Sequence, residues 1–246
     1  MNLILINPDE LDAAGRARLS DERAKHIQKV LRAAPGKTLR IGRLNGPLGI
    51  GTVEEILDDS VTLACEFEAE TPPRPSMDLL LAMPRPKVLK RLWAQFAALG
   101  VGRIFITNAE KVERYYFDTH ILNPDFYNAR FIEGLQQARD TRLPEVTIVK
   151  SLKPFLENEP FPTLGKKVLA DPSGTQNISQ ALESNCVASP RILLGIGPEG
   201  GWVPYELEMF KAHGFEAFGM GPRILRTDTA CIALLGMILE IQRRDS

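Results

Sequence analysis

The chain has 246 residues, of which 44% are hydrophobic and 25% charged, and its formal net charge is −1. This length suits two domains better than one small one, and the composition is that of an ordinary globular protein. The three cysteines, Cys65, Cys186 and Cys231, lie far apart and indicate neither a disulfide framework nor a zinc site, so we expect no metal. The first apolar run is too short for a signal peptide and no segment reaches transmembrane length, so we expect a cytoplasmic protein with no membrane partner.

Charge is segregated in the amino-terminal part of the chain. Residues 16–43 contain nine Lys and Arg against two acids, whereas residues 54–70 contain seven acids and no base. Such a distribution presents a positive face to phosphates although the overall charge is near zero. The alternative is an ordinary solvated surface. We expect RNA contact here, and the candidate residues are Arg16, Arg18, Lys25, Lys29 and Arg32.

The same region predicts a short helix followed by a small β-barrel. Asp21 offers a helix cap, and the apolar stripe after it continues up to Arg32. Three short β-like runs follow, at 38–41, 50–56 and 61–67. Pro72, Pro73 and Pro75 then forbid a helix or a central strand. We therefore place one domain at 1–70, a linker at 71–76 and a second domain at 77–246.

Beyond the linker, strands alternate with helices, which predicts an α/β domain with a mostly parallel sheet. The expected strands are 78–83, 101–107, 168–170, 192–196 and 215–220, and the expected helices are 87–99, 123–139, 203–213 and an apolar helix covering 231–241. Arg85 and Lys87 lie near the end of the first of these strands, where they contact RNA phosphates or simply solvate a helix start. The aromatic residues between these elements are assigned to the core or to an interface, with base-stacking surfaces as the alternative. They are Tyr115, Tyr116, Phe117, Phe126 and Tyr127.

Two glycine-dense turns follow two of the expected strands. Gly197-Pro198-Glu199-Gly200-Gly201 comes directly after 192–196, and Gly221-Pro222-Arg223-Ile224-Leu225-Arg226-Thr227-Asp228-Thr229-Ala230 comes after 215–220. Glycine lets another molecule approach the main chain closely. In open α/β sheets, ligands bind beyond the carboxyl ends of the strands, so both turns could line one pocket. The alternative for either turn alone is a tight turn with no ligand.

Together, in this order and spacing, the two turns resemble the signature of the RsmE family. That family belongs to the SPOUT superfamily and methylates N3 of a uridine in 16S ribosomal RNA with S-adenosylmethionine. His26 with Val30-Leu31-Arg32 also resembles the family's amino-terminal pattern, which adds His26 to the candidate RNA-binding residues. The resemblance implies a SPOUT-type knotted parallel-sheet domain, a preceding PUA-like β-barrel, a homodimer completed by the final apolar helix, and 16S rRNA or the small ribosomal subunit as partner.

The resemblance also implies which residues bind the cofactor. They lie in the two turns, in the strand before the first turn, and at one residue following the strand at 168–170. They are Asp171, Gly195, Ile196, Gly197, Pro198, Gly200, Met220, Gly221, Ile224, Leu225 and Thr229. For Asp171 the alternative is a turn-initiating aspartate before Pro172.

Three residues are candidates for the chemistry. Uridine N3 is a poor nucleophile until its proton leaves, so the site must accept that proton or stabilise the resulting negative charge. Arg226 suits charge stabilisation, with a salt bridge or phosphate contact as the alternative. Asp228 is a base, an orienting group for Arg226 or a helix cap. Glu199 either faces the sulfonium charge or fixes its own loop.

This sequence departs from the family pattern at several positions. Gln95 and Ala98 replace a Lys and a Glu, Gln136 and Asp140 replace a Glu and an Arg, and Asp228 replaces a Glu. Two other functions therefore stay open. One is another SPOUT RNA methyltransferase that acts on a ribose 2′-hydroxyl or a different base, and the other is a non-catalytic RNA-binding factor in ribosome assembly.

Overall fold

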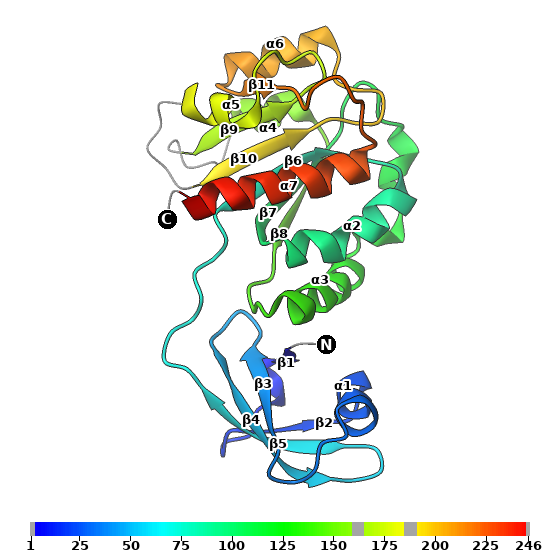
Figure 1. Cartoon of the computed structure of the whole chain (residues 1–246). Helices are drawn as coiled ribbons and strands as arrows, with labels where there is room; N and C mark the ends of the chain where they lie inside the picture. Colours follow the sequence, from blue (N-terminus) through cyan, green and yellow to red (C-terminus); the bar gives the residue numbers. More distant parts are fainter. Residues whose placement is uncertain (1–2, 159–164, 185–190, 245–246) are drawn as a thin grey trace. The chain divides into compact units, whose positions relative to one another are not determined.

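The computed structural model describes residues 3–158, 165–184 and 191–244, so Cys186 lies outside the described residues (Figure 1). Two compact units are present. The first contains the chain up to Arg74 together with Asn128–Leu143, and the second contains Pro75–Tyr127 and the chain from Pro144 onward. The functional domains expected at 1–70 and 77–246 stay a prediction.

A five-stranded sheet forms the first unit, with the order β1-β3-β4-β5-β2. Strands β3, β4 and β5 confirm the three predicted β runs, whereas β1 and β2 were not predicted. β1 pairs with β3 in parallel and all other neighbours are antiparallel. A register shift between Val53 and Glu55 interrupts the β4–β5 ladder, and such bulges bend a strand, so the sheet curls into a half-barrel. The strands are β1 (Ile4–Ile6), β2 (Arg16–Leu19), β3 (Thr38–Arg43), β4 (Leu48–Ile56) and β5 (Val61–Phe67).

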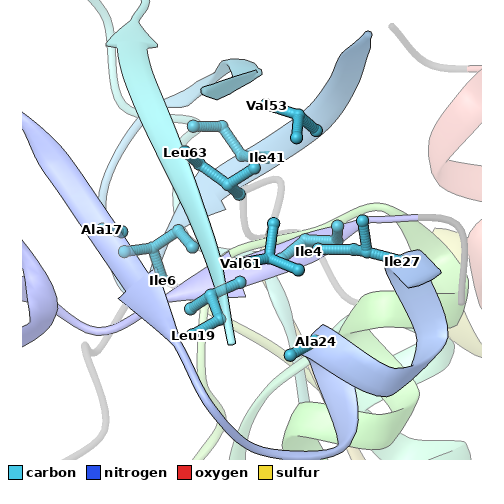
Figure 2. Close-up of a cluster of buried hydrophobic side chains, with 10 residues drawn as sticks. All are labelled: Ile4, Ile6, Ala17, Leu19, Ala24, Ile27, Ile41, Val53, Val61 and Leu63. Atoms are coloured by element: carbon cyan, nitrogen blue, oxygen red, sulfur yellow. The ribbon is translucent and has the colours of Figure 1, made fainter. Parts of the chain in front are cut away.

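The inward faces of these strands and of the following helix make one apolar core (Figure 2). The helix is α1 (Glu22–Lys25), and the Asp21 side chain caps it by accepting the Arg23 N–H at 2.9 Å, as the sequence predicts. A π-helical turn, His26–Val30, continues it. The core side chains are Ile4, Ile6, Ala17, Leu19, Ala24, Ile27, Ile41, Val53, Val61 and Leu63.

The end of helix α3 (Pro124–Ala138) and the turn after it complete the first unit. The buried Thr141 hydroxyl donates to the Gly46 carbonyl at 2.6 Å, and the Leu143 N–H donates to Asn45 Oδ1 at 3.0 Å. Asp140 shapes this turn, because its carboxylate accepts the Thr141 N–H at 2.6 Å. The aspartate that replaces a family arginine therefore has a structural role here.

A six-stranded, all-parallel sheet forms the second unit and confirms the predicted architecture. Its order is β11-β9-β10-β6-β7-β8. Strands β6 and β10 are buried along their whole length, as central strands of parallel sheets are. The edge strand β8 was not predicted. The strands are β6 (Met77–Ala82), β7 (Val101–Thr107), β8 (Glu145–Val149), β9 (Lys166–Ala170), β10 (Ile192–Ile196) and β11 (Glu216–Phe218).

Helices connect these strands, and the final helix α7 packs along β10 and beside α2 (Figure 1). The predicted helices are confirmed within a few residues, whereas α4 and α5 were not predicted. The helices of this unit, besides the start of α3, are α2 (Pro86–Ala98), α4 (Leu152–Glu157), α5 (Ile178–Ser184), α6 (Pro204–Ala212) and α7 (Thr227–Arg244), with the 3₁₀ turns η3 (Arg114–Phe117) and η4 (His120–Leu122).

A buried ion cluster ties three strands together near their amino-terminal ends. Asp78 on β6 has a side chain that is 1% exposed, and it accepts from Arg191 at 2.7 Å and from Arg103 at 2.5 Å. Arg103 lies on β7, and Arg191 directly precedes β10. Removal of one member of such a cluster leaves uncompensated charge in a buried place, so the cluster is a stability element of this unit.

No helix in the described part of the chain combines the length and the hydropathy needed to cross a membrane. Strand order alone does not define how the chain threads through its own loops. The knot that the family resemblance implies therefore stays a prediction.

Candidate active site

Three strands of the parallel sheet end at the same edge. Ala170, the last residue of β9, pairs with Ile196 at the end of β10 and with Phe218 at the end of β11. Parallel strands point their carboxyl ends in one direction, so the loops that follow them meet. The structure therefore brings the two predicted glycine turns and Asp171 together.

These loops enclose a cavity of about 320 Å³, a volume typical of a small-molecule site. Of the predicted cofactor residues, it is lined by Asp171, Ile196, Gly197, Pro198, Met220, Gly221, Ile224 and Leu225. Glu199 and Arg226 line it as well. Gly201, Arg223, Thr227 and Ala230, which belong to the two predicted turns, line it too. The sequence analysis gave no cofactor-binding role to the other lining residues, which are Ala170, Pro172, Trp202, Phe218 and Leu234.

Two predicted cofactor glycines lie outside the lining. Gly195 is inside β10, where a Cβ atom would stand 2.6 Å from Leu169 Cδ1, so close packing within the sheet accounts for this glycine. Gly200 is packed against Lys111, and its carbonyl accepts from Lys111 Nζ at 2.7 Å. Thr229, within α7, is also absent from the lining.

The first glycine turn is fixed by its own backbone. The Gly201 N–H donates to the Pro198 carbonyl at 2.8 Å, and Gly201 has a φ of +70°, a conformation that side chains disfavour. Glu199 Oε1 accepts the Arg85 N–H at 3.1 Å. This hydrogen bond ties the first glycine turn to the loop after β6, and a role of Glu199 toward the sulfonium charge stays a prediction.

Glu206 is a buried carboxylate of this site that the sequence analysis missed. Its Oε2 accepts the Val203 N–H at 2.9 Å at the start of α6, and its Oε1 accepts the Glu110 N–H at 2.8 Å. It therefore ties the loop after β7 to the segment that follows the first glycine turn. A glutamate three residues after the start of a helix was the available signal.

The loops after β9 and β11 contact each other through backbone. A Cβ on Gly174 would lie 2.4 Å from the Phe218 carbonyl carbon, and one on Gly219 would lie 2.5 Å from the Gly174 oxygen. Asp171 begins the first of these loops and accepts the Ser173 N–H at 2.8 Å. Asp171 is thus a turn-initiating residue, which is the alternative that the sequence left open. It also lines the cavity.

At the second turn, Arg226 and Asp228 have different surroundings. Arg226 is exposed, lines the cavity and makes no ion pair among the described residues. Asp228 lies within the first turn of α7 and pairs with Arg91 of α2 at 2.7 Å. The helix-cap prediction for Asp228 is wrong. The Arg226 carbonyl accepts the Ala230 N–H at 2.8 Å, so Arg226, and not Asp228, is the N-cap residue of α7.

Trp202 gives the cavity an unsatisfied donor. Its indole ring packs edge to face on Phe210, with centroids 4.8 Å apart, and lies beside Gly197. Trp202 Nε1 is buried and has no hydrogen-bond partner among the described residues. Such an orphaned donor costs free energy unless a ligand or water accepts from it.

In the first unit, several predicted RNA-binding residues have partners. Arg16 lies 3.4 Å from Asp12, and Lys25 pairs with Glu22. Arg18 donates to Ser60 Oγ at 3.2 Å. Part of the local positive charge is therefore neutralised.

The remaining predicted residues of that unit lie on and beside the π-helical turn. Lys29 and Arg32 are exposed and form no ion pair within the described ranges. His26 is half-buried, and its Nε2 has no partner among the described residues. Lys29 and Arg32 are thus the most available cations of this set. In the second unit, Arg85 and Lys87 are exposed at the start of α2.

Neither described cysteine is suited to nucleophilic chemistry. Burial raises the pKa of the Cys65 thiol to about 11, and burial also raises the pKa of Cys231. Among the described residues, no three His, Cys, Asp or Glu side chains are grouped to hold a metal ion.

Comparison with known proteins identifies the family. The RNA methyltransferase domain family matches residues 71–239. A relative from Treponema pallidum, named ribosomal RNA small subunit methyltransferase E, is 31% identical over 97% of this chain and 91% of its own length. The chain belongs to the methyltransferase E family. Another methyltransferase E, from Borreliella burgdorferi, is 27% identical and covers 95% of each chain.

Solved structures agree with the methyltransferase E fold. A methyltransferase E from Neisseria gonorrhoeae, bound to S-adenosyl methionine, matches 98% of each chain with a TM-score of 0.77 and 19% identity. A Legionella pneumophila protein in complex with the same cofactor matches 98% of this chain and 97% of its own, with a TM-score of 0.74 and 22% identity. The predicted family and the predicted fold class are confirmed.

Proposed function

We propose that this protein transfers a methyl group from S-adenosylmethionine to N3 of a uridine in the 16S rRNA of the small ribosomal subunit. Its membership of the methyltransferase E family supports the reaction class and the ribosomal substrate. One observation carries the proposal, namely that both glycine turns line a single cavity at the carboxyl edge of the parallel sheet.

The cavity fits the cofactor. Its volume of about 320 Å³ is in the range of small-molecule sites, and the orphaned Trp202 N–H offers a donor to a ligand oxygen or nitrogen. Gly221 leaves the main chain open to close approach, because it has a φ of +83° with no neighbour near its Cβ position. Gly197 instead makes room for the Trp202 indole, since a Cβ there would lie 3.0 Å from Trp202 Nε1. When bound, the cofactor supplies an electrophilic methyl group.

The residues of the chain prepare the acceptor. Loss of the N3 proton spreads negative charge over the uracil oxygens, and the unpaired Arg226 guanidinium at the cavity is suited to stabilise it. Of the two candidate carboxylates, Glu199 lines the cavity, whereas Asp228 is absent from the lining and is held by Arg91. Glu199 is therefore the better placed to accept the proton, and Asp228 orients the start of α7.

The amino-terminal domain, 1–70, binds the RNA. Exposed Lys29 and Arg32 provide phosphate contacts, as do Arg85 and Lys87 in the second unit. Arg16, Arg18 and Lys25 belong to the same basic region and exchange their local partners for phosphates on binding. His26 belongs to this region too, and its Nε2 has no partner among the described residues. Because the substrate is ribosomal, the enzyme acts in the cytoplasm.

The active form is a homodimer. Helix α7 buries Leu234, Leu235 and Ile238 within its own unit, but leaves Ile232 and Met237 exposed. Large apolar side chains exposed on an otherwise packed helix are typical of a subunit interface. A second copy of the chain covers them, as the family resemblance implies.

The decisive experiment is a methylation assay on small ribosomal subunits that lack the modification, followed by mapping of the methylated nucleotide. A methyl group at uridine N3 supports the proposal. Nucleoside analysis that finds a ribose 2′-O-methyl group or another methylated base favours the second SPOUT reaction. No heat of binding in a calorimetric titration with S-adenosylmethionine favours the non-catalytic assembly factor.

A further inference from the structure

Tyr115 is an exposed aromatic residue that the methyl-transfer site does not use. It lies in the 3₁₀ turn η3, its relative exposure is 63%, and it makes an edge-to-face contact with Tyr116 at 4.9 Å between ring centroids. The sequence analysis assigned this aromatic cluster to the core or an interface. For Tyr115 the core assignment is wrong, because most of the ring faces solvent.

The turn that carries Tyr115 is connected to the rim of the cavity. Lys111, four residues earlier, donates to the Gly200 carbonyl at 2.7 Å in the first glycine turn. The Arg85 N–H donates to Glu199, which lines the cavity. The segment that carries Tyr115 and the loop that carries Arg85 therefore both contact the first glycine turn, at adjacent residues. A hydrogen bond with Tyr116 raises the pKa of Tyr115.

Exposed cations accompany this aromatic ring. Arg85, Lys87 and Arg114 are exposed and have no ion pair within the described part of the chain. Two exposed acids, Glu113 and Asp118, flank the same turn. An exposed aromatic ring beside several unpaired cations is the composition of a single-stranded nucleic-acid surface, where bases stack on the ring and phosphates meet the cations.

The proposed reaction requires unpaired RNA at this place. N3 lies on the Watson–Crick edge of uracil, so a paired uridine cannot present it to the cofactor. The target nucleotide must be single-stranded or turned out of its stack, and that leaves the adjoining base without a stacking neighbour. An exposed aromatic side chain on the segment that contacts the first glycine turn replaces that neighbour.

We propose that Tyr115 stacks on an RNA base next to the methylated uridine, while Arg85 and Arg114 contact the flanking phosphates. This inference rests on the proposed function and names the state of its substrate, which is a single-stranded segment. It assigns Tyr115 to substrate binding and gives it no part in cofactor binding.

The test compares Tyr115→Ala and Tyr115→Phe with a matched control, Tyr205→Ala. Tyr205 is also 63% exposed in the same unit, but it lies on α6 close to the exposed Glu208. With unmodified small subunits as substrate, Tyr115→Ala raises KM for the subunit about tenfold, in line with the loss of one stacked base. The Phe variant and the Tyr205 control stay near wild type, and the calorimetric affinity for S-adenosylmethionine is unchanged in all three.

A binding measurement separates this inference from the proposed function. A fluorescein-labelled single-stranded oligouridine binds Tyr115→Ala more weakly than it binds the wild type. A duplex of the same length binds the wild type and the variants with equal affinity. If the wild-type protein binds the oligouridine in this Tyr115-dependent way yet methylates nothing, the proposed function fails and the RNA contact stands. Unchanged KM and oligouridine affinity in Tyr115→Ala would overturn the inference. A change of oligomeric state in sedimentation would also overturn it, because Tyr115 would then be a subunit contact.

Discussion

Replacing Gly174 with Ala tests whether the contact between two loops shapes the cofactor cavity. The new Cβ would lie 2.4 Å from the Phe218 carbonyl carbon and 2.6 Å from the Gly219 nitrogen. Both neighbours are backbone atoms, so they cannot rotate away, and the loops after β9 and β11 must separate. Overpacking of this kind costs about 1–3 kcal/mol. Binding S-adenosylmethionine closes the cavity and pushes the two loops back against the new Cβ, so this cost is taken from the free energy of binding. The affinity for S-adenosylmethionine then falls by roughly fivefold to 150-fold.

Isothermal titration calorimetry with S-adenosylmethionine measures this loss, and circular dichroism checks that the fold persists. Gly236→Ala is the matched control, because its Cβ position in α7 has no neighbour within 4 Å and alanine favours a helix. The control binds the cofactor as the wild type does, and sedimentation checks that its oligomeric state is unchanged, because Gly236 lies one helical turn after the exposed Ile232. Wild-type affinity in Gly174→Ala would refute the reasoning that these two loops hold the cavity in shape.

Three further changes have defined outcomes. Arg226→Ala keeps its calorimetric affinity for the cofactor but loses about 10²–10³ in kcat, as after loss of one charge-stabilising donor, and near-normal turnover would remove Arg226 from the mechanism. Asp78→Ala removes the buried partner of Arg103 and Arg191 and lowers the free energy of unfolding in urea by about 3–5 kcal/mol. A loss below about 1 kcal/mol would contradict the role of this ion cluster in stability. Burial opposes ionisation of Glu10, but hydrogen bonds from Arg23 and from a backbone N–H outweigh it, so its pKa lies below the ordinary 4.5. The ionised Glu10 therefore stabilises the fold fully above that pH, and this contribution is lost as the pH falls through the lowered pKa. In urea, the difference in free energy of unfolding between wild type and Glu10→Gln therefore shrinks on acidification. A difference that stays constant with pH would show that the Glu10–Arg23 pair is unimportant.

The parts of the fold that the sequence predicted are those with strong local signals. Strands β7 and β10 were placed at their observed bounds because each is an apolar run bounded by helix ends, glycine or proline. Strand β8 was missed although Glu145–Val149 alternates exposed and half-buried residues and is rich in β-branched side chains, which is the pattern of an edge strand. Strand β1 has only three residues, and its pairing with β3 connects positions far apart in sequence, which no local pattern reports.

The candidate site likewise has parts that local sequence signals predicted and parts that they did not. The glycine turns were predictable because glycine and proline mark turns, and their meeting followed from the geometry of parallel strands. The contacts that fix them were not predictable. The Glu206 carboxylate and the Glu110 N–H are 96 residues apart, and Arg91 and Asp228 are 137 apart, so only the folded chain brings these groups together. Asp228 was read as a cap because the start of α7 was placed after it rather than before it.

The position of Asp78 along β6 has a consequence for how this enzyme can change. Asp78 pairs with Leu193 on β10, three residues before Ile196, where the cavity begins, and three residues of strand span about 10 Å. The charges that hold the strands together and the loops that meet the ligand thus occupy opposite ends of the same sheet. Substitutions that alter substrate preference can therefore accumulate at one end without loosening the other.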